Sequence, residues 1–181
     1  MSLKPIIDLS DIDLSSVAAD QRSIAQILPH RGDMLMLSRI VWHDHTHDHA
    51  VAVKEVGQNE FWVPGHIPGY ALMPGVLMVE AGAQLSSWMY YQRSGKSWFA
   101  GFTRIEDTTF RGQVLPGDTL VLMSECLKYH EKRFVSRVQG WVDGNPVFQS
   151  KITGMAFPKI SMGERRPLEE FNEAGCSAGG A

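Results

Sequence analysis

The stretch of sequence that most restricts the fold lies between Pro74 and Gly95. Residues 75–93 contain no proline, and apolar side chains cover nearly the whole circumference that these residues would present as a helix. Such a helix is stable only when other elements surround it, because its apolar surface would otherwise face water. The stretch therefore predicts one long helix that is buried on most of its sides.

The segments on either side of this helix indicate what surrounds it. Residues 35–49 and 51–56 have the pattern of two strands, and Asp20 can cap a short helix over residues 21–28. Residues 57–74 contain three prolines and three glycines and are expected to form an irregular loop. Four more strands are expected after the helix, over residues 97–110, 119–129, 134–142 and 147–157, with turns at residues 116–118 and 143–145.

These elements predict an α+β fold in which an antiparallel sheet wraps around one central helix. A chain of 181 residues is long enough for one domain with a proper core. We expect an N-terminal extension over residues 1–26, a single domain over residues 27–157 and a C-terminal tail over residues 158–181.

Composition argues against several classes of function. The net charge is −3, without the basic excess that is typical of proteins that bind nucleic acid. No apolar run is long enough to span a membrane, and the first residues lack the pattern of a secretory signal. The two cysteines, Cys126 and Cys176, lack the spacing of metal ligands. We expect a cytoplasmic protein with reduced thiols, no bound metal and no cofactor.

The long helix carries one carboxylate in an apolar setting. Glu80 lies in its middle, Gln84 follows four residues later on the same face, and Ser87 continues that face. A buried carboxylate is costly unless it is paired or hydrogen-bonded. Two interpretations stay open: Glu80 and Gln84 form a structural pair at the surface, or Glu80 has a raised pKa and donates a proton.

The start of the helix offers two further groups with chemical potential. Gly75 belongs to the first turn, where backbone N–H groups have no partner inside the helix and attract negative charge. His66 lies in the loop before it, and histidine is the side chain best suited to act as a base near neutral pH. A base, an oxyanion donor and an acid are the groups needed to remove a proton next to a carbonyl and expel a β-substituent.

Residues 66–84, with the sequence HIPGYALMPGVLMVEAGAQ, resemble the signature of the hotdog-fold 3-hydroxyacyl-(acyl-carrier-protein) dehydratases. Shorter segments extend the resemblance over about residues 27–157: Leu28-Pro29-His30-Arg31, Phe99-Ala100-Gly101, Phe110-Arg111, Pro116-Gly117-Asp118 and Val142-Asp143-Gly144. The resemblance implies a hotdog fold, in which the sheet wraps around the long helix.

The resemblance also implies an activity and an assembly. The protein would remove water from (3R)-3-hydroxyacyl thioesters on acyl carrier protein, giving trans-2-enoyl thioesters for fatty-acid or related lipid synthesis. His66 and Glu80 would be catalytic and would come from different subunits of a homodimer with a continuous sheet, often assembled further as a trimer of dimers. Gly75, Val76 and Gln84 would bind the oxyanion and the substrate.

Apolar residues that flank the motif, or that lie on the strand expected to cross it, are predicted to line a tunnel for the acyl chain. These are Leu72, Met73, Leu77, Phe99 and Phe102. Two alternatives to the dehydratase remain at this point. One is a hotdog acyl thioesterase, and the other is a hotdog protein that binds acyl chains without catalysis.

Three other features of the sequence could be functional sites. Histidines at positions 43, 45, 47 and 49 alternate as metal ligands on a strand would, but we interpret them as a solvated hairpin tip. His30 is interpreted as a structural contact rather than a residue of the site. Four basic residues are either ordinary surface charge or a rim that attracts an acidic carrier protein: Arg93, Lys96, Arg104 and Arg111.

Overall fold

The computed structural model of the protein describes the backbone of residues 3–161 and the side chains of residues 3–157. The chain begins with β1 (Ala19–Asp20), α1 (Gln21–Ile27), a 3-10 turn (Gly32–Met34), β2 (Arg39–His43) and β3 (His49–Glu55). It continues with α2 (Gly75–Ser94), β4 (Trp98–Phe110), β5 (Thr119–His130), β6 (Arg133–Val142) and β7 (Asn145–Ser161). No helix in the described part of the chain is long and apolar enough to cross a membrane.

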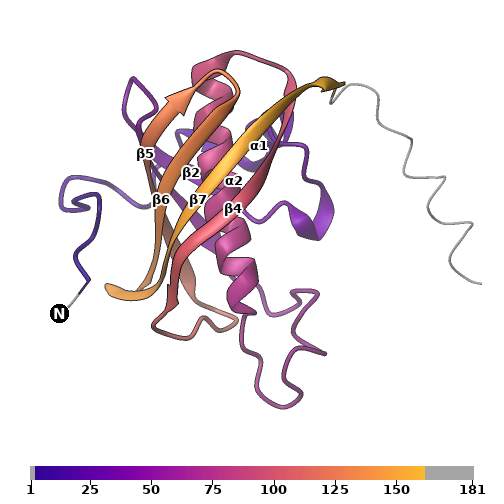
Figure 1. Ribbon diagram of the computed structural model, residues 1–181. Coiled ribbons are helices and arrows are strands. Elements are labelled where there is room, and N and C mark those ends of the chain that lie inside the picture. Colours follow the sequence, from indigo (N-terminus) through magenta and orange to yellow (C-terminus); the bar gives the residue numbers. More distant parts are fainter. Residues whose placement is uncertain (1–2, 162–181) are drawn as a thin grey trace, which may run out of the picture.

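All strands of the described chain form one antiparallel sheet in the order β1-β2-β3-β5-β6-β7-β4. The strands curve around α2, and the loop of residues 57–74 projects beyond the sheet at the end where α2 begins (Figure 1). Strand β4 forms one edge of this sheet and pairs only with β7 among the described strands. The expected α+β architecture, a sheet wrapped around one helix, is confirmed.

The main core forms between α2 and the inner face of the sheet. Twelve of the twenty residues of α2 are buried, and Leu85 and Trp88 are the largest fully buried side chains among them. Gly82 lets the helix approach the sheet closely, since a Cβ there would lie 3.1 Å from Val138 and 3.4 Å from Phe148. The apolar side chains around the helix are therefore buried by packing on several sides.

Local signals set the limits of both helices as expected. The side chain of Asp20 accepts a hydrogen bond from the backbone N–H of Ser23 (2.8 Å) and caps α1. Helix α2 ends before Gly95, whose left-handed backbone (φ 61°) is the conformation that glycine adopts without strain.

The first predicted strand, over residues 35–49, is longer than the strand that forms. Strand β2 covers only Arg39–His43, because Met36 in the segment before it bonds to α2 instead of to a strand: its N–H donates to the side chain of Gln84. After β2, the carboxylate of Asp44 accepts hydrogen bonds from the N–H groups of Asp48 and His49 and closes the turn.

The N-terminal segment packs against the outer face of the sheet. Ile7 is 7% exposed and belongs to a second apolar cluster with residues of β2, β3, β5 and β6. Gln139 in β6 fixes the segment by accepting a hydrogen bond from the N–H of Ile6 (3.0 Å) and donating one to the carbonyl of Lys4 (3.1 Å). At the other end, the predicted tail of residues 158–181 overlaps β7, which extends to Ser161, and residues 162–181 lie outside the described residues.

Candidate active site

Glu80 is in the second turn of α2, with a side chain that is 15% exposed. Its Oε1 atom has two neighbours with nitrogen donors: Nε2 of Gln84 at 2.8 Å and Nε2 of His30 at 3.2 Å. His30 belongs to the segment that follows α1, 50 residues earlier in the chain. The prediction that His30 is only a structural contact outside the site is therefore wrong.

Gln84 is fixed by the backbone of the segment that leads into β2. Its Oε1 accepts a hydrogen bond from the N–H of Met36 (3.0 Å), and its Nε2 donates to the carbonyl oxygen of Met34 (2.8 Å). Because a backbone N–H can only donate and a carbonyl can only accept, the orientation of the amide is unambiguous. The amide group therefore presents N–H, and never oxygen, to Glu80.

The pKa of Glu80 lies below its ordinary value. Burial raises the pKa, but the hydrogen bonds from His30 and Gln84 and the charge of His30 together outweigh burial and lower it. The interpretation of Glu80 as a carboxyl group with a raised pKa is therefore wrong for this chain alone. The interpretation as a pair with Gln84 is closer, although Glu80 is mostly buried and also contacts His30.

A cavity of about 230 Å³ borders Glu80. Its walls are residues 29–30, the side of α2 that carries residues 80–87, and residues 99–102 of β4. Phe99 and Phe102, two of the predicted tunnel residues, belong to these walls. The other three, Leu72, Met73 and Leu77, are not part of them. Met73 is 1% exposed in the core, where its N–H donates to the carbonyl of Val114.

Helix α2 begins at Gly75, directly after Pro74, which provides no side-chain cap. The backbone N–H groups of Gly75 and Val76 lie in the first turn, where backbone donors have no partner within the helix. Val76 is 72% exposed, so this end of the helix is open to solvent. A Cβ atom on Gly75 would lie 2.7 Å from the ring of Phe110 in β4. Glycine thus leaves room for the ring of Phe110 at the start of the helix.

His66 is exposed in the loop before α2, and its ring is held in one tautomer. Its ring Nδ1 lies 2.6 Å from the carbonyl oxygen of Leu72. The backbone N–H of His66 donates to the carbonyl oxygen of Trp62 (2.9 Å). Since the carbonyl of Leu72 can only accept, Nδ1 carries the proton. Nε2 then has a lone pair and no hydrogen-bond partner among the described residues, so this ring can accept a proton there.

Within one chain, His66 and Glu80 do not form a common site. His66 is absent from the walls of the cavity that borders Glu80, and no hydrogen bond joins the two residues in the described part of the chain. Large exposed apolar side chains occur on the edge strand β4, in the loop before α2 and in the first turn of α2. They are Phe61, Ile67, Tyr70, Val76, Phe102, Ile105 and Phe110.

Comparison with known proteins identifies the family. A family profile described as a FabA-like domain matches residues 28–151. The 3-hydroxyacyl-(acyl-carrier-protein) dehydratases FabZ of Staphylococcus carnosus and Staphylococcus aureus are each 36% identical over 135 residues, which cover 74% of this chain and 92% of theirs. This chain belongs to the FabA-like dehydratase family.

Solved structures confirm the hotdog fold of this family member. The dehydratase heterocomplex ApeI:P from Xenorhabdus doucetiae aligns with a TM-score of 0.64 and 15% identity, over 75% of this chain and 91% of that one. Cj0977, a virulence protein from Campylobacter jejuni, aligns with a TM-score of 0.61 and 16% identity, over 82% and 97% of the two chains. At these identities the likeness concerns the fold alone.

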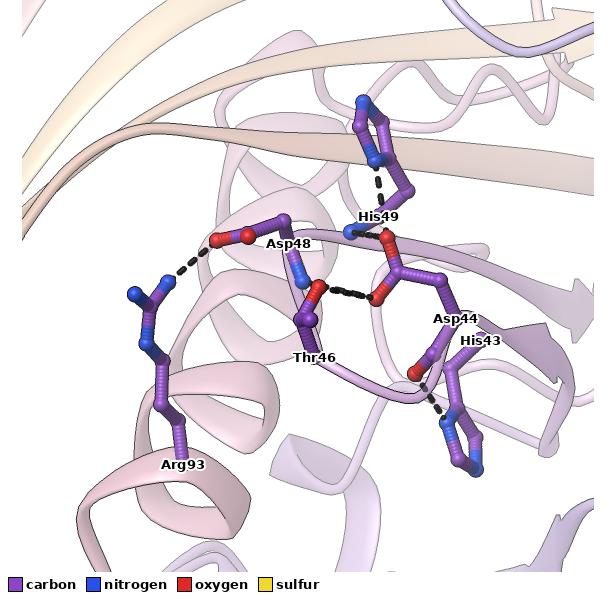
Figure 2. A network of polar contacts seen from close by, with 6 residues as sticks. All are labelled: His43, Asp44, Thr46, Asp48, His49 and Arg93. Atoms are coloured by element: carbon purple, nitrogen blue, oxygen red, sulfur yellow. Dashed lines mark hydrogen bonds and ion pairs between the residues drawn. The ribbon is translucent and has the colours of Figure 1, made fainter.

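The histidine-rich hairpin of this FabA-like chain is organised by packing and hydrogen bonds. Figure 2 shows Asp44 turned toward Thr46 and His49, and Arg93 reaching from α2 to Asp48. The rings of His43 and His47 stack with centroids 4.6 Å apart and lie against the ring of Trp88. Within residues 3–157, no group of three or more metal-ligating side chains is placed to hold an ion.

Three of the four residues of the predicted basic rim have acidic partners. Arg93 pairs with Asp48, Lys96 with Glu131 (3.2 Å) and Arg104 with Glu106 (3.6 Å). The backbone N–H of Arg111 donates to the carbonyl of Val147. Because the first three charges are balanced locally, the interpretation as ordinary surface charge is the better supported one.

Proposed function

We propose that the protein is a dehydratase of (3R)-3-hydroxyacyl thioesters carried on acyl carrier protein, producing trans-2-enoyl thioesters in fatty-acid synthesis. Membership of the FabA-like family supports this activity. The structural observation that carries the proposal is the tautomer of His66, which leaves Nε2 ready to accept a proton. The catalytic domain is proposed to span residues 27–157 of a cytoplasmic protein.

The reaction needs one proton removed and one proton delivered. Nε2 of His66 takes the proton from the α-carbon, and the electron pair of that C–H bond forms the new α,β double bond. The C–O bond at the β-carbon breaks, its electron pair leaves with the hydroxyl oxygen, and Glu80 protonates this oxygen to release water. Negative charge that develops on the thioester carbonyl is stabilised by the N–H groups of Gly75 and Val76.

We propose that each active site combines His66 of one protomer with Glu80 of its partner. Two observations support this arrangement. His66 lies outside the cavity that borders Glu80 in its own chain. Strand β4 is a 13-residue edge strand with exposed apolar side chains, and pairing it with a second β4 would produce a continuous sheet across a dimer. We also propose that three such dimers assemble as a trimer of dimers.

The lowered pKa of Glu80 in the single chain has a consequence for this mechanism. A general acid must carry a proton before the reaction, so the pKa of Glu80 has to rise when the site is complete. A partner subunit and a bound acyl chain would both remove water from the cavity, and desolvation raises the pKa of a carboxyl group. We therefore expect the acid form of Glu80 mainly in the substrate-bound dimer.

The activity is tested by mixing the purified protein with a trans-2-enoyl or 3-hydroxyacyl thioester of acyl carrier protein and following the enoyl absorbance. His66→Ala and Glu80→Gln are each expected to reduce turnover by roughly 10²–10⁴-fold, the range for an acid or base group. Release of free thiol without hydration or dehydration would favour a thioesterase instead. Binding of the acyl chain without any turnover would favour a non-catalytic role.

A further inference from the structure

Both protein donors to Glu80 converge on one of its two carboxylate oxygens. Nε2 of Gln84 and Nε2 of His30 lie 2.8 and 3.2 Å from Oε1. No residue in the described part of the chain forms a hydrogen bond with Oε2 of Glu80. The carboxyl group is therefore held through one oxygen, and the other oxygen is left for a ligand.

The surroundings of His30 indicate which of its ring nitrogens donates to Glu80. Its Nδ1 atom is buried and has no hydrogen-bond partner among the described residues. Since a carboxylate oxygen can only accept, Nε2 carries a proton, and this proton points to Oε1 of Glu80.

We propose that His30 is a positioning residue, which together with Gln84 holds Glu80 through Oε1 so that Oε2 faces the substrate and transfers the proton. This inference rests on the proposed dehydratase function. Two donors are needed because a single hydrogen bond would leave the carboxyl group free to rotate about its terminal torsion. Gln84 approaches along the helix and His30 from the segment after α1, so the contacts restrain the group from two directions.

His30 is the ionisable neighbour that matters most for the titration of Glu80. Glu80 and His30 are the only ionisable residues in the walls of the cavity, whose other parts come from α2 and β4. Arg31, next to His30, directs its guanidinium to the carbonyl oxygens of Leu28 and His30. Asp33, in the 3-10 turn that follows, is exposed. A substitution at His30 should therefore change the titration of Glu80 directly.

Two variants separate positioning from a simple structural role. His30→Phe keeps a ring of similar size and removes the donor, whereas His30→Gln keeps an N–H donor without a titratable ring. We expect kcat at its pH optimum to fall about 10–100-fold in His30→Phe, as for residues that orient a catalytic group. KM should stay unchanged, and His30→Gln should recover most of kcat. Equal losses in both variants, with an unchanged pH profile, would overturn the proposal.

A second measurement does not depend on turnover. The titration of the Glu80 carboxyl group is followed by carbon NMR of protein labelled at glutamate, with Glu80→Gln identifying the signal. His30→Phe should move this titration to higher pH, because a donor that lowers the pKa is lost; His30→Ala serves if the phenylalanine variant fails to fold. An unchanged titration would refute the coupling of His30 to Glu80. A shifted titration in a protein without dehydratase activity would refute the proposed function and leave this coupling intact.

Discussion

Gly154 and Phe134 are cross-strand partners in β7 and β6, and the buried ring of Phe134 covers the glycine. A Cβ atom on Gly154 would overlap this ring, which is 2% exposed and has no room to move. Gly75 and Phe110 form a similar contact at the start of α2, but Phe110 is 48% exposed. The two pairs therefore differ mainly in whether the ring can swing away.

This difference predicts unequal effects of the same substitution. Gly154→Ala should lower the free energy of unfolding by about 2–3 kcal/mol, as overpacking in a core does. Gly75→Ala should cost less than about 1 kcal/mol, because the ring of Phe110 can turn toward solvent. Urea unfolding monitored by fluorescence measures both, and equal costs would show that ring mobility is not what distinguishes them.

The buried ion pair of Lys54 and Glu60 gives a second prediction. Nζ of Lys54 lies 2.7 Å from Oε1 of Glu60, and the two side chains are 7% and 13% exposed. Glu60 also accepts the N–H of Gly57 (3.1 Å). Glu60→Gln should cost about 3 kcal/mol of unfolding free energy, because it leaves the ammonium group of Lys54 buried without a counter-charge.

A double-mutant cycle checks this interpretation of the ion pair. Lys54→Met combined with Glu60→Gln should be less destabilised than the sum of the two single variants, since no unpaired charge remains. Glu106→Gln is the matched control at a more exposed pair with Arg104 and should change stability by less than about 1 kcal/mol. Additive costs at Lys54 and Glu60 would contradict the prediction.

The stacked histidines of the hairpin predict a loss of stability in mild acid. The pKa of His47 lies below its ordinary value of 6.5, first because of burial and second because of the charge of His43. The unfolded chain therefore binds this proton at a higher pH than the folded chain. Stability is fully present above about pH 6.5 and declines as the pH falls from there to the lower pKa of the folded state.

Urea midpoints measured between about pH 5 and 8 test this dependence. His47→Asn removes the titrating ring and suits the left-handed backbone at this position (φ 56°), so it should flatten the decline. His45→Asn changes an exposed histidine of the same turn and should leave the decline in place. If His47→Asn keeps the full pH dependence, the decline has another origin.

The limits of α2 and its burial inside a sheet could be predicted, because both follow from local sequence. Pro74 and Gly95 mark both ends of α2, and the apolar circumference between them implies a surrounding sheet. The contact between His30 and Glu80 was missed because it joins residues 50 positions apart, which no local pattern encodes. One signal in the sequence pointed to this contact. His30 lies in a segment whose sequence resembles the same protein family as the motif around Glu80 does.

The packing of the N-terminal segment was missed for a related reason. The first 20 positions contain four aspartates, but apolar residues lie between them at positions 3, 6, 7, 9, 12 and 14. These side chains stabilise the fold only when they pack against an apolar outer face of the sheet. Strands β2, β3, β5 and β6 provide this face once the sheet has formed. The pattern of one segment cannot reveal a surface that is assembled from four others.

A substitution in this segment should therefore behave as a core substitution. Ile7→Ser removes a side chain that is 7% exposed and should lower the unfolding free energy by about 2 kcal/mol. Val17→Ser is the control, because Val17 is 59% exposed. Chemical unfolding compares the two variants, and similar small effects would indicate that the segment contributes little to the stability of the folded chain.

The final prediction tests whether His66 and Glu80 of different protomers share a site. The variants His66→Ala and Glu80→Gln are unfolded together, refolded as a mixture and assayed for dehydration. In a heterodimer with shared sites, one site contains both substitutions and the other contains neither. Random pairing of equal amounts should then restore about one quarter of the wild-type activity, since half of the dimers each regain one of two sites.

If both residues served the same site from one chain, every site in this mixture would lack one of them. The mixture would then be no more active than the two variants measured apart. Each variant refolded alone is the matched control, and the double variant mixed with wild-type protein gives the opposite pattern, because its heterodimers contain no intact shared site. Restored activity in the first mixture, together with loss in the second, is the outcome that the edge strand β4 and the separation of His66 from the Glu80 cavity lead us to expect.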